Sequence, residues 1–64
     1  MAKIKSVATT KNGKVAVVIT RDRKIAIDTI RKEYGVKTRQ IISAHSECEF
    51  STHSYYYVVF WRNA

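Results

Sequence analysis

The feature that most constrains this chain is an apolar segment near its end, HSYYYVVFWRN at residues 53–63. Seven of the eight residues from Tyr55 to Arg62 are bulky and apolar or aromatic, which is typical of a β-strand covered on both faces. A chain of 64 residues closes one core only, and domains of this size bury roughly 60% of the surface that the unfolded chain exposes. The sequence therefore predicts one domain, residues 1–64, and raises the question of what covers the second face of this strand.

A β-hairpin is predicted at the start of the chain. Residues 3–10 and 15–20 are rich in β-branched residues, and the Asn12-Gly13 pair between them favours a two-residue type I′ turn because both residues tolerate a positive φ. This turn places Ala8 opposite Val17. Alternation then assigns to the core face Ile4, Ser6, Ala8, Val15, Val17 and Ile19. It assigns to the open face Lys3, Lys5, Val7, Thr9, Lys11, Lys14, Ala16 and Val18.

An amphipathic helix is predicted for residues 21–34, where the apolar spacing changes from two residues to that of a helix. Thr20 or Asp22 is suited to cap its start, and Gly35 stands where a helix end favours a left-handed residue. The apolar side of this helix carries Ile27, Ile30 and Tyr34.

A second hairpin is predicted from residues 37–50 and 54–62, with Glu49 opposite Ser54. The face expected beneath the helix carries Ile42, Ala44, Ser46, Cys48, Tyr55, Tyr57, Val59 and Trp61. The other face carries Ile41, Ser43, His45, Glu47, Tyr56, Val58, Phe60 and Arg62. The predicted fold is α+β, in the order ββαββ, with a single four-stranded antiparallel sheet and one helix packed on one face. The way in which the two hairpins join is left open.

The charge of the chain favours a polyanionic partner. The net charge is +7, and residues 1–39 hold eleven basic and three acidic residues, whereas residues 40–64 hold Arg62 against Glu47 and Glu49. An excess of this kind attracts nucleic acid through the release of counterions, although it also serves solubility alone. The expected phosphate contacts are Lys3, Lys5, Lys11, Lys14, Arg21, Arg23, Lys24, Lys37 and Arg39.

The aromatic strand predicts an interface. Tyr56, Val58 and Phe60 are left on the side of the sheet that the helix does not cover, and contiguous exposed apolar patches mark interaction sites. A small domain also gains stability from a partner subunit, so we expect a homodimer. The leading hypothesis is a non-catalytic nucleic-acid-binding protein of DNA or RNA. The alternative is a protein-binding regulator or inhibitor that uses the open aromatic face on a protein partner.

Catalysis, metals and cofactors have little support in the sequence. His45 and Cys48 are three positions apart, an odd spacing, so along a strand they point to opposite faces, and no third residue orients them. His45, His53 and Cys48 do not have a zinc-site spacing, and the glycines do not form a phosphate-binding loop. No apolar run is long enough to cross a membrane, and a single cysteine suits a reducing compartment. We therefore expect a cytoplasmic protein that is not an enzyme and needs no cofactor.

Overall fold

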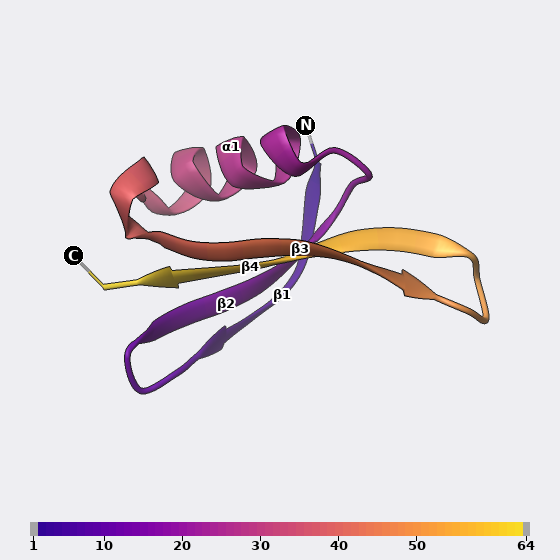
Figure 1. Ribbon diagram of the computed structural model, residues 1–64, viewed down its shortest axis with the longest axis horizontal. Coiled ribbons are helices and arrows are strands. Elements are labelled where there is room, and N and C mark those ends of the chain that lie inside the picture. Colours follow the sequence, from indigo (N-terminus) through magenta and orange to yellow (C-terminus); the bar gives the residue numbers. More distant parts are fainter. Residues whose placement is uncertain (1, 64) are drawn as a thin grey trace.

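The computed structural model describes residues 2–63, which form one sheet and one α-helix (Figure 1). The elements are β1 (Lys3–Thr9), β2 (Gly13–Ile19), α1 (Arg23–Tyr34), the short 3-10 helix η1 (Thr38–Gln40), β3 (Ile41–Glu49) and β4 (Ser54–Arg62). All neighbouring strands are antiparallel, and their order in the sheet is β1-β2-β4-β3. The predicted α+β fold, ββαββ with one four-stranded antiparallel sheet and a helix on one face, is confirmed.

Both ends of α1 are set by the residues that the sequence indicated. The Asp22 carboxylate accepts hydrogen bonds from the backbone N–H groups of Lys24, at 2.9 Å, and Ile25, at 3.4 Å. These bonds satisfy donors that have no partner within the first turn of a helix. Gly35 ends the helix in the left-handed conformation, with φ of 64°. The helix is therefore held in place locally before it packs on the sheet.

The core lies between α1 and the sheet. Its buried apolar members are Ala16, Val18, Ala26, Ile30, Val36, Val59 and Trp61. Tyr34 at the end of α1 packs on Trp61, with their ring centroids 5.3 Å apart. Ala16 is the partner of Val59 across β2 and β4, so a small side chain leaves room for the helix above two central strands.

The predicted register of the first hairpin is wrong. Ala8 lies opposite Val15 rather than Val17, and Lys11 and Asn12, not Asn12 and Gly13, are the two turn residues. Neither Asn12 nor Gly13 has a positive φ. Gly13 is instead required by the approach of β4, because a Cβ on Gly13 would lie 2.1 Å from the backbone oxygen of Trp61.

The predicted faces of β2 are exchanged in the structure. Ala16 and Val18 are buried beneath α1, whereas Val15, Val17 and Ile19 lie on the open face. The reason is the pairing with β4: Ala16 and Val18 lie opposite Val59 and Tyr57, which face the helix. The helix side of the first hairpin therefore also carries Val7, Thr9 and Lys14. The open side also carries Ser6 and Ala8.

Two irregularities of register reassign residues near the strand ends. In β1 the register shifts between Ile4 and Ser6, so Lys5 is unpaired and Ile4 returns to the helix side opposite Val18. Ile4 packs against the core, as expected. In β3 the shift between Ile41 and Ser43 makes Ile41 the partner of Trp61. Ile42, expected beneath the helix, is therefore the extra residue and is 61% exposed.

The second hairpin has the predicted register, with Glu49 opposite Ser54 and Ala44 opposite Val59. Strand β3 begins at Ile41, because residues 38–40 form η1 rather than the first part of the predicted strand. The last pair between β2 and β4 is Val18 with Tyr57. Beyond it, residues 47–56 continue as a two-stranded hairpin with its loop, which projects past the start of α1 (Figure 1). We call this segment the acidic arm.

Candidate functional site

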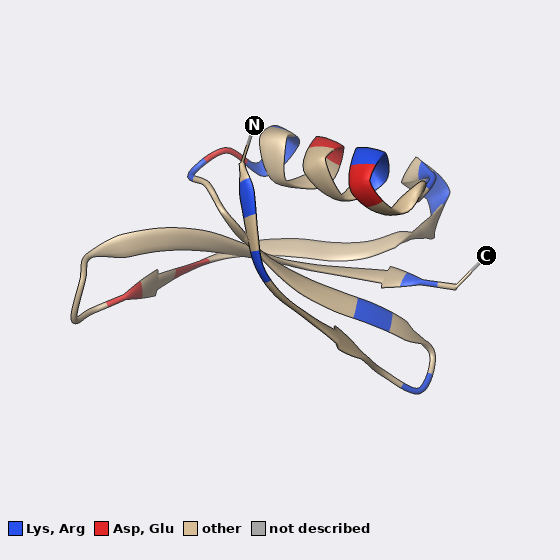
Figure 2. Cartoon of the chain, turned by 180° about the vertical axis from the view of Figure 1, so that it is seen from behind, with Lys and Arg blue, Asp and Glu red and all other residues tan. Residues whose placement is uncertain are grey.

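Five basic residues belong to segments at the end of the molecule opposite the acidic arm (Figure 2). We define this basic end as Lys11, Lys14, Lys37, Arg39 and Arg62. They come from three segments: the tip of the first hairpin, the η1 turn and the end of β4 (Figure 2). Residues 10–14, 36–40 and 60–63, which form these segments, contain no acidic residue.

The fold itself brings these segments together. Gly13 is the strand partner of Arg62, and the Asn63 backbone N–H donates to the Asn12 carbonyl oxygen at 3.4 Å. On the other side of β4, the Gln40 side-chain amide donates to the Arg62 carbonyl oxygen at 3.0 Å. The end of β4 is thus tied to both the first hairpin and η1.

An open hollow lies between η1 and the end of β4. It has a volume of about 290 Å³ and is lined by Arg39, Gln40, Arg62 and Asn63. The η1 turn that carries Arg39 is itself fixed, because the Lys37 backbone N–H donates to the Gln40 side-chain oxygen at 2.9 Å. Two guanidinium groups and the Asn63 amide, all suited to bind phosphate oxygens, therefore line one depression, and the Gln40 amide is held by its bonds to Lys37 and Arg62.

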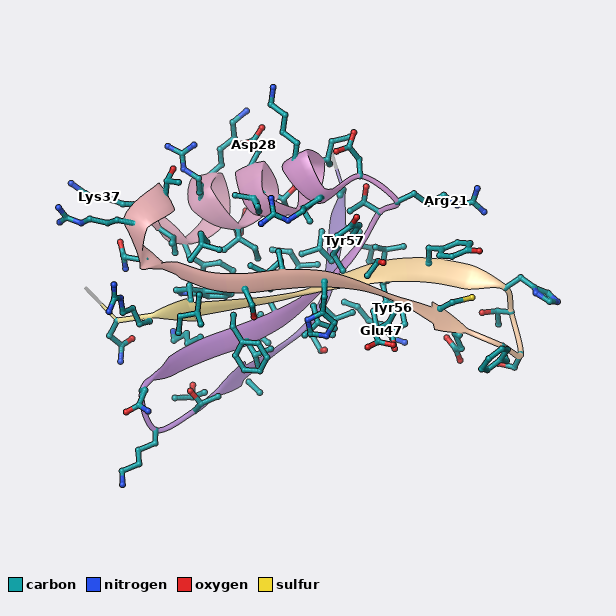
Figure 3. The ribbon with its side chains drawn as sticks, in the orientation of Figure 1. Arg21, Asp28, Lys37, Glu47, Tyr56 and Tyr57 are labelled. Carbon is teal, nitrogen blue, oxygen red and sulfur yellow. The ribbon has the colours of Figure 1, made fainter. Side chains whose placement is uncertain are left out.

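The basic end has no ion pair with the rest of the described chain. Within residues 2–63, ion pairs join Asp28 to Arg31 at 4.0 Å and His45 to Glu47 at 3.5 Å. Lys37 points away from the end of α1 in Figure 3. Lys11, Lys37, Arg39 and Arg62 are exposed, and Lys14 is partly buried on the helix side of β2. No carboxylate among residues 2–63 is therefore ion-paired with a cation of the basic end.

The other predicted contacts lie around the start of α1. Lys3 is the strand partner of Ile19, two residues before Arg21, and Lys5 is the unpaired residue of β1. Arg23 and Lys24 begin α1 and are exposed. We define the helix-start group as Lys3, Lys5, Arg21, Arg23 and Lys24. The acidic residue Asp22 lies between Arg21 and Arg23, next to members of this group. The predicted contacts are therefore divided between two regions rather than spread over one sheet face.

Arg21 is engaged within the protein. Its guanidinium carbon lies 4.7 Å from the centre of the Tyr55 ring, a cation–π contact between the loop before α1 and the acidic arm. Arg21 and Tyr55 line a hollow together with Ser46 and Tyr57. Tyr57 rises from the sheet toward the helix side, as Figure 3 shows. This arginine supports the base of the arm, whereas the basic end has no such contact.

The acidic arm carries the opposite charge. It contains Glu47 and Glu49 but no lysine or arginine, and it lies far from the basic end along a molecule 36 Å long (Figure 2). Phe50 in its loop is 88% exposed. The protein thus has a charge axis along its strands, from the basic end to the acidic arm.

The open sheet face is more apolar than expected. Tyr56, Val58 and Phe60 lie on it as predicted, and all three are half-buried. Their β2 neighbours are Val15 and Val17, whereas the predicted register had placed Lys14, Ala16 and Val18 of this strand on the open face. Figure 3 shows Tyr56 and Glu47 on the side of the sheet away from α1. Of the lysines expected on this face, Lys3 alone is paired with a residue of the open side, Ile19.

The structure assembles no catalytic or metal-binding cluster among the residues it describes. His45 is paired with Val58 on the open face, and Cys48 is paired with Tyr55 on the helix side. Within residues 2–63 no three histidine, cysteine or acidic side chains are grouped as a metal site would require. No helix in this part of the chain is long and apolar enough to cross a membrane.

Arg62 is the site residue that sequence reasoning missed. It stood in the half of the chain with a net negative charge and was assigned only to the open face. Its proximity to Lys11, Lys14 and Arg39 depends on the central position of β4 in the sheet. The strand order was the signal needed, and it is not a local property of the sequence.

Comparisons with known proteins gave no significant match: no family model matches the chain, no curated protein matches its sequence, and no solved structure matches it.

Proposed function

We propose that this protein is a small, non-catalytic nucleic-acid-binding protein whose basic end contacts the phosphate backbone. The observation that carries the proposal is the meeting of three segments that hold five basic residues and no acidic residue, with Arg39 and Arg62 lining one hollow. Phosphate contacts of this kind position a protein on nucleic acid without reading its sequence.

The charge of the basic end accounts for both affinity and orientation. Five cations that neutralise five phosphates release condensed counterions, which gives a salt slope of about −4.5 for duplex DNA. Glu47 and Glu49 are repelled by the same polyanion, so the arm is directed away from it. The expected complex is end-on, with the open sheet face free.

Aromatic stacking is not part of the proposed contact. Tyr56 and Phe60 are flanked on β2 by valine and isoleucine rather than by lysine, so a strand stacked on them would lack partners for its phosphates. Binding through the backbone alone predicts weak dependence on nucleotide sequence.

A protein-binding regulator is the second candidate, and the apolar character of the open face favours it. Val15, Val17, Val58 and Phe60 are neighbours across β2 and β4 on a side that α1 does not cover. A protein partner bound through this face would be insensitive to moderate salt, because burial of apolar surface is not screened.

The test is a titration of labelled random-sequence DNA and RNA at 50 and 200 mM salt, followed by fluorescence anisotropy. With about five phosphate contacts, affinity should fall by roughly two to three orders of magnitude over this range. Absence of binding to either polymer at low salt, with circular dichroism showing a folded sample, would reject the proposal and promote the protein-binding alternative.

A further inference from the structure

The open sheet face is the largest surface of the molecule that its fold leaves uncovered. Its apolar centre consists of Val15, Val17, Ile19, Tyr56, Val58 and Phe60. Four strands spaced about 4.8 Å apart and six paired residues rising about 3.3 Å each outline roughly 400 Å² for the whole open face, of which the apolar centre occupies the two middle strands. A contiguous apolar patch rimmed by polar residues is typical of an interaction site in a soluble protein.

We infer that a second copy of this chain covers the open face, with a two-fold axis that lies between the two sheets and crosses the strands at Val58. A two-fold interface requires a surface that is complementary to itself. Val58 is the middle of this surface, because its partners are Val17 on β2 and His45 on β3. Valines from both copies would then meet at the axis.

The charges along β4 and its partners select the direction of the axis. Arg62 is four residues beyond Val58, and Ser54, the partner of Glu49, is four residues before it. All of these residues lie on the open side by strand alternation. Rotation about an axis across the strands therefore brings Glu49 of one copy toward Arg62 of the other, twice per dimer.

The other two-fold direction is disfavoured by the same charges. An axis along the strands would place one basic end against the other and one acidic arm against the other. Like charges juxtaposed across an interface are unfavourable, and complementary ones fix its register. The charge axis of the monomer thus specifies an antiparallel arrangement of two copies.

The dimer leaves Lys14, Lys37 and Arg39 of the proposed nucleic-acid contact accessible, whereas Arg62 is engaged by Glu49 of the other copy. Lys14 lies on the helix side of β2, and Lys37 and Arg39 lie in and beside η1, which follows α1. Each dimer would carry one basic end at either extremity. The inference does not depend on nucleic-acid binding, since it concerns the open face of the sheet, which shares only Arg62 with the basic end.

Sedimentation velocity at 1 to 200 μM tests the dimer. The wild-type protein should pass from monomer to dimer with concentration, and Phe60→Asp should remain monomeric because it places an unpaired carboxylate in the apolar interface. The matched control is Ile42→Asp, which alters an exposed apolar residue outside the open-face centre and should still dimerise. A wild-type monomer at every concentration, or a folded Phe60→Asp protein that dimerises normally, overturns the inference.

Charge reversal tests the direction of the axis with variants that keep the apolar centre intact. Glu49→Lys and Arg62→Glu should each raise the dimer dissociation constant by roughly tenfold, because each creates two like-charged contacts. The double variant restores both pairs and should return to the wild-type value. If the single variants dimerise as the wild type does, or if their effects simply add, the antiparallel arrangement is wrong.

Discussion

The four-stranded half of the protein and the acidic arm share strands β3 and β4 but differ in burial and in charge. In the half covered by α1, β4 contributes the buried Val59 and Trp61. In the arm, Tyr55 is 45% exposed and Phe50 is 88% exposed, and no residue of 47–56 is buried. Stability is therefore concentrated in one half, while the other is a projection held at its base by Arg21 and Tyr55.

The difference shows how one hairpin serves two purposes. Where β2 pairs with β4, small and branched side chains such as Ala16 support the helix. Where β2 ends, β3 and β4 continue alone and carry acidic residues away from the basic end. Packing against α1 thus determines the residues of β4 from Tyr57 to Trp61. Charge distinguishes the acidic arm, to which the start of β4 belongs.

The largest expected difference in stability is between substitutions of two aromatic residues on the helix side of β4. Trp61→Ala should lower the free energy of unfolding by about 3–5 kcal/mol, because it opens a cavity beneath Tyr34 and the end of α1. Tyr55→Ala removes a ring that is 45% exposed and one cation–π contact, and should cost about 1 kcal/mol. Urea denaturation monitored by circular dichroism measures both. Equal losses of stability would mean that Tyr55 in the arm contributes as much to the core as Trp61 does.

The next effect compares the two glycines, both in the stable half. Gly13→Ala should cost about 2–3 kcal/mol, because its Cβ meets the backbone of Trp61 and Arg62, which cannot move without opening the β2–β4 pairing. Gly35→Ala has free space around it and should cost about 1 kcal/mol, the strain of a left-handed residue. Thermal unfolding would rank the two. A more stable Gly13→Ala protein would contradict the observed approach of β4.

The helix and the second hairpin were predictable because their signals are local. Asp22 and Gly35 bound the helix through hydrogen bonds and backbone conformation within a few residues. The register with Glu49 opposite Ser54 follows from a short loop and a clear alternation on both strands. These elements require no knowledge of the remaining chain.

The first hairpin was mispredicted because its local signal has a tertiary cause. Gly13 serves the close contact with β4, so Asn12-Gly13 resembled a turn that the chain does not form. The irregularities at Lys5 and Ile42 then reversed the faces of the residues beside them, which alternation alone cannot show. Lys14, which was assigned to the open face, consequently lies on the helix side of β2, and Lys11 lies in the turn.

The candidate site was predicted in composition but not in location. Lys11, Lys14, Lys37 and Arg39 were named as phosphate contacts, yet their meeting with Arg62 depends on β4 lying between β2 and β3. The apolar strand was correctly expected to leave Tyr56, Val58 and Phe60 on the uncovered side. What covers them depends on another molecule and is the subject of the dimer inference.

The most direct test of the central claim is nucleic-acid binding by two charge-matched variants. One carries Lys11→Glu and Lys14→Glu at the basic end, and the other carries Arg23→Glu and Lys24→Glu at the start of α1, so both lose the same net charge. Anisotropy titrations at several salt concentrations should show much weaker binding for the first variant, with its salt slope reduced by roughly 1.4 to 1.8, and a near wild-type slope for the second. Equal losses, or a larger loss for the helix-start variant, would contradict the assignment of the contact to the basic end.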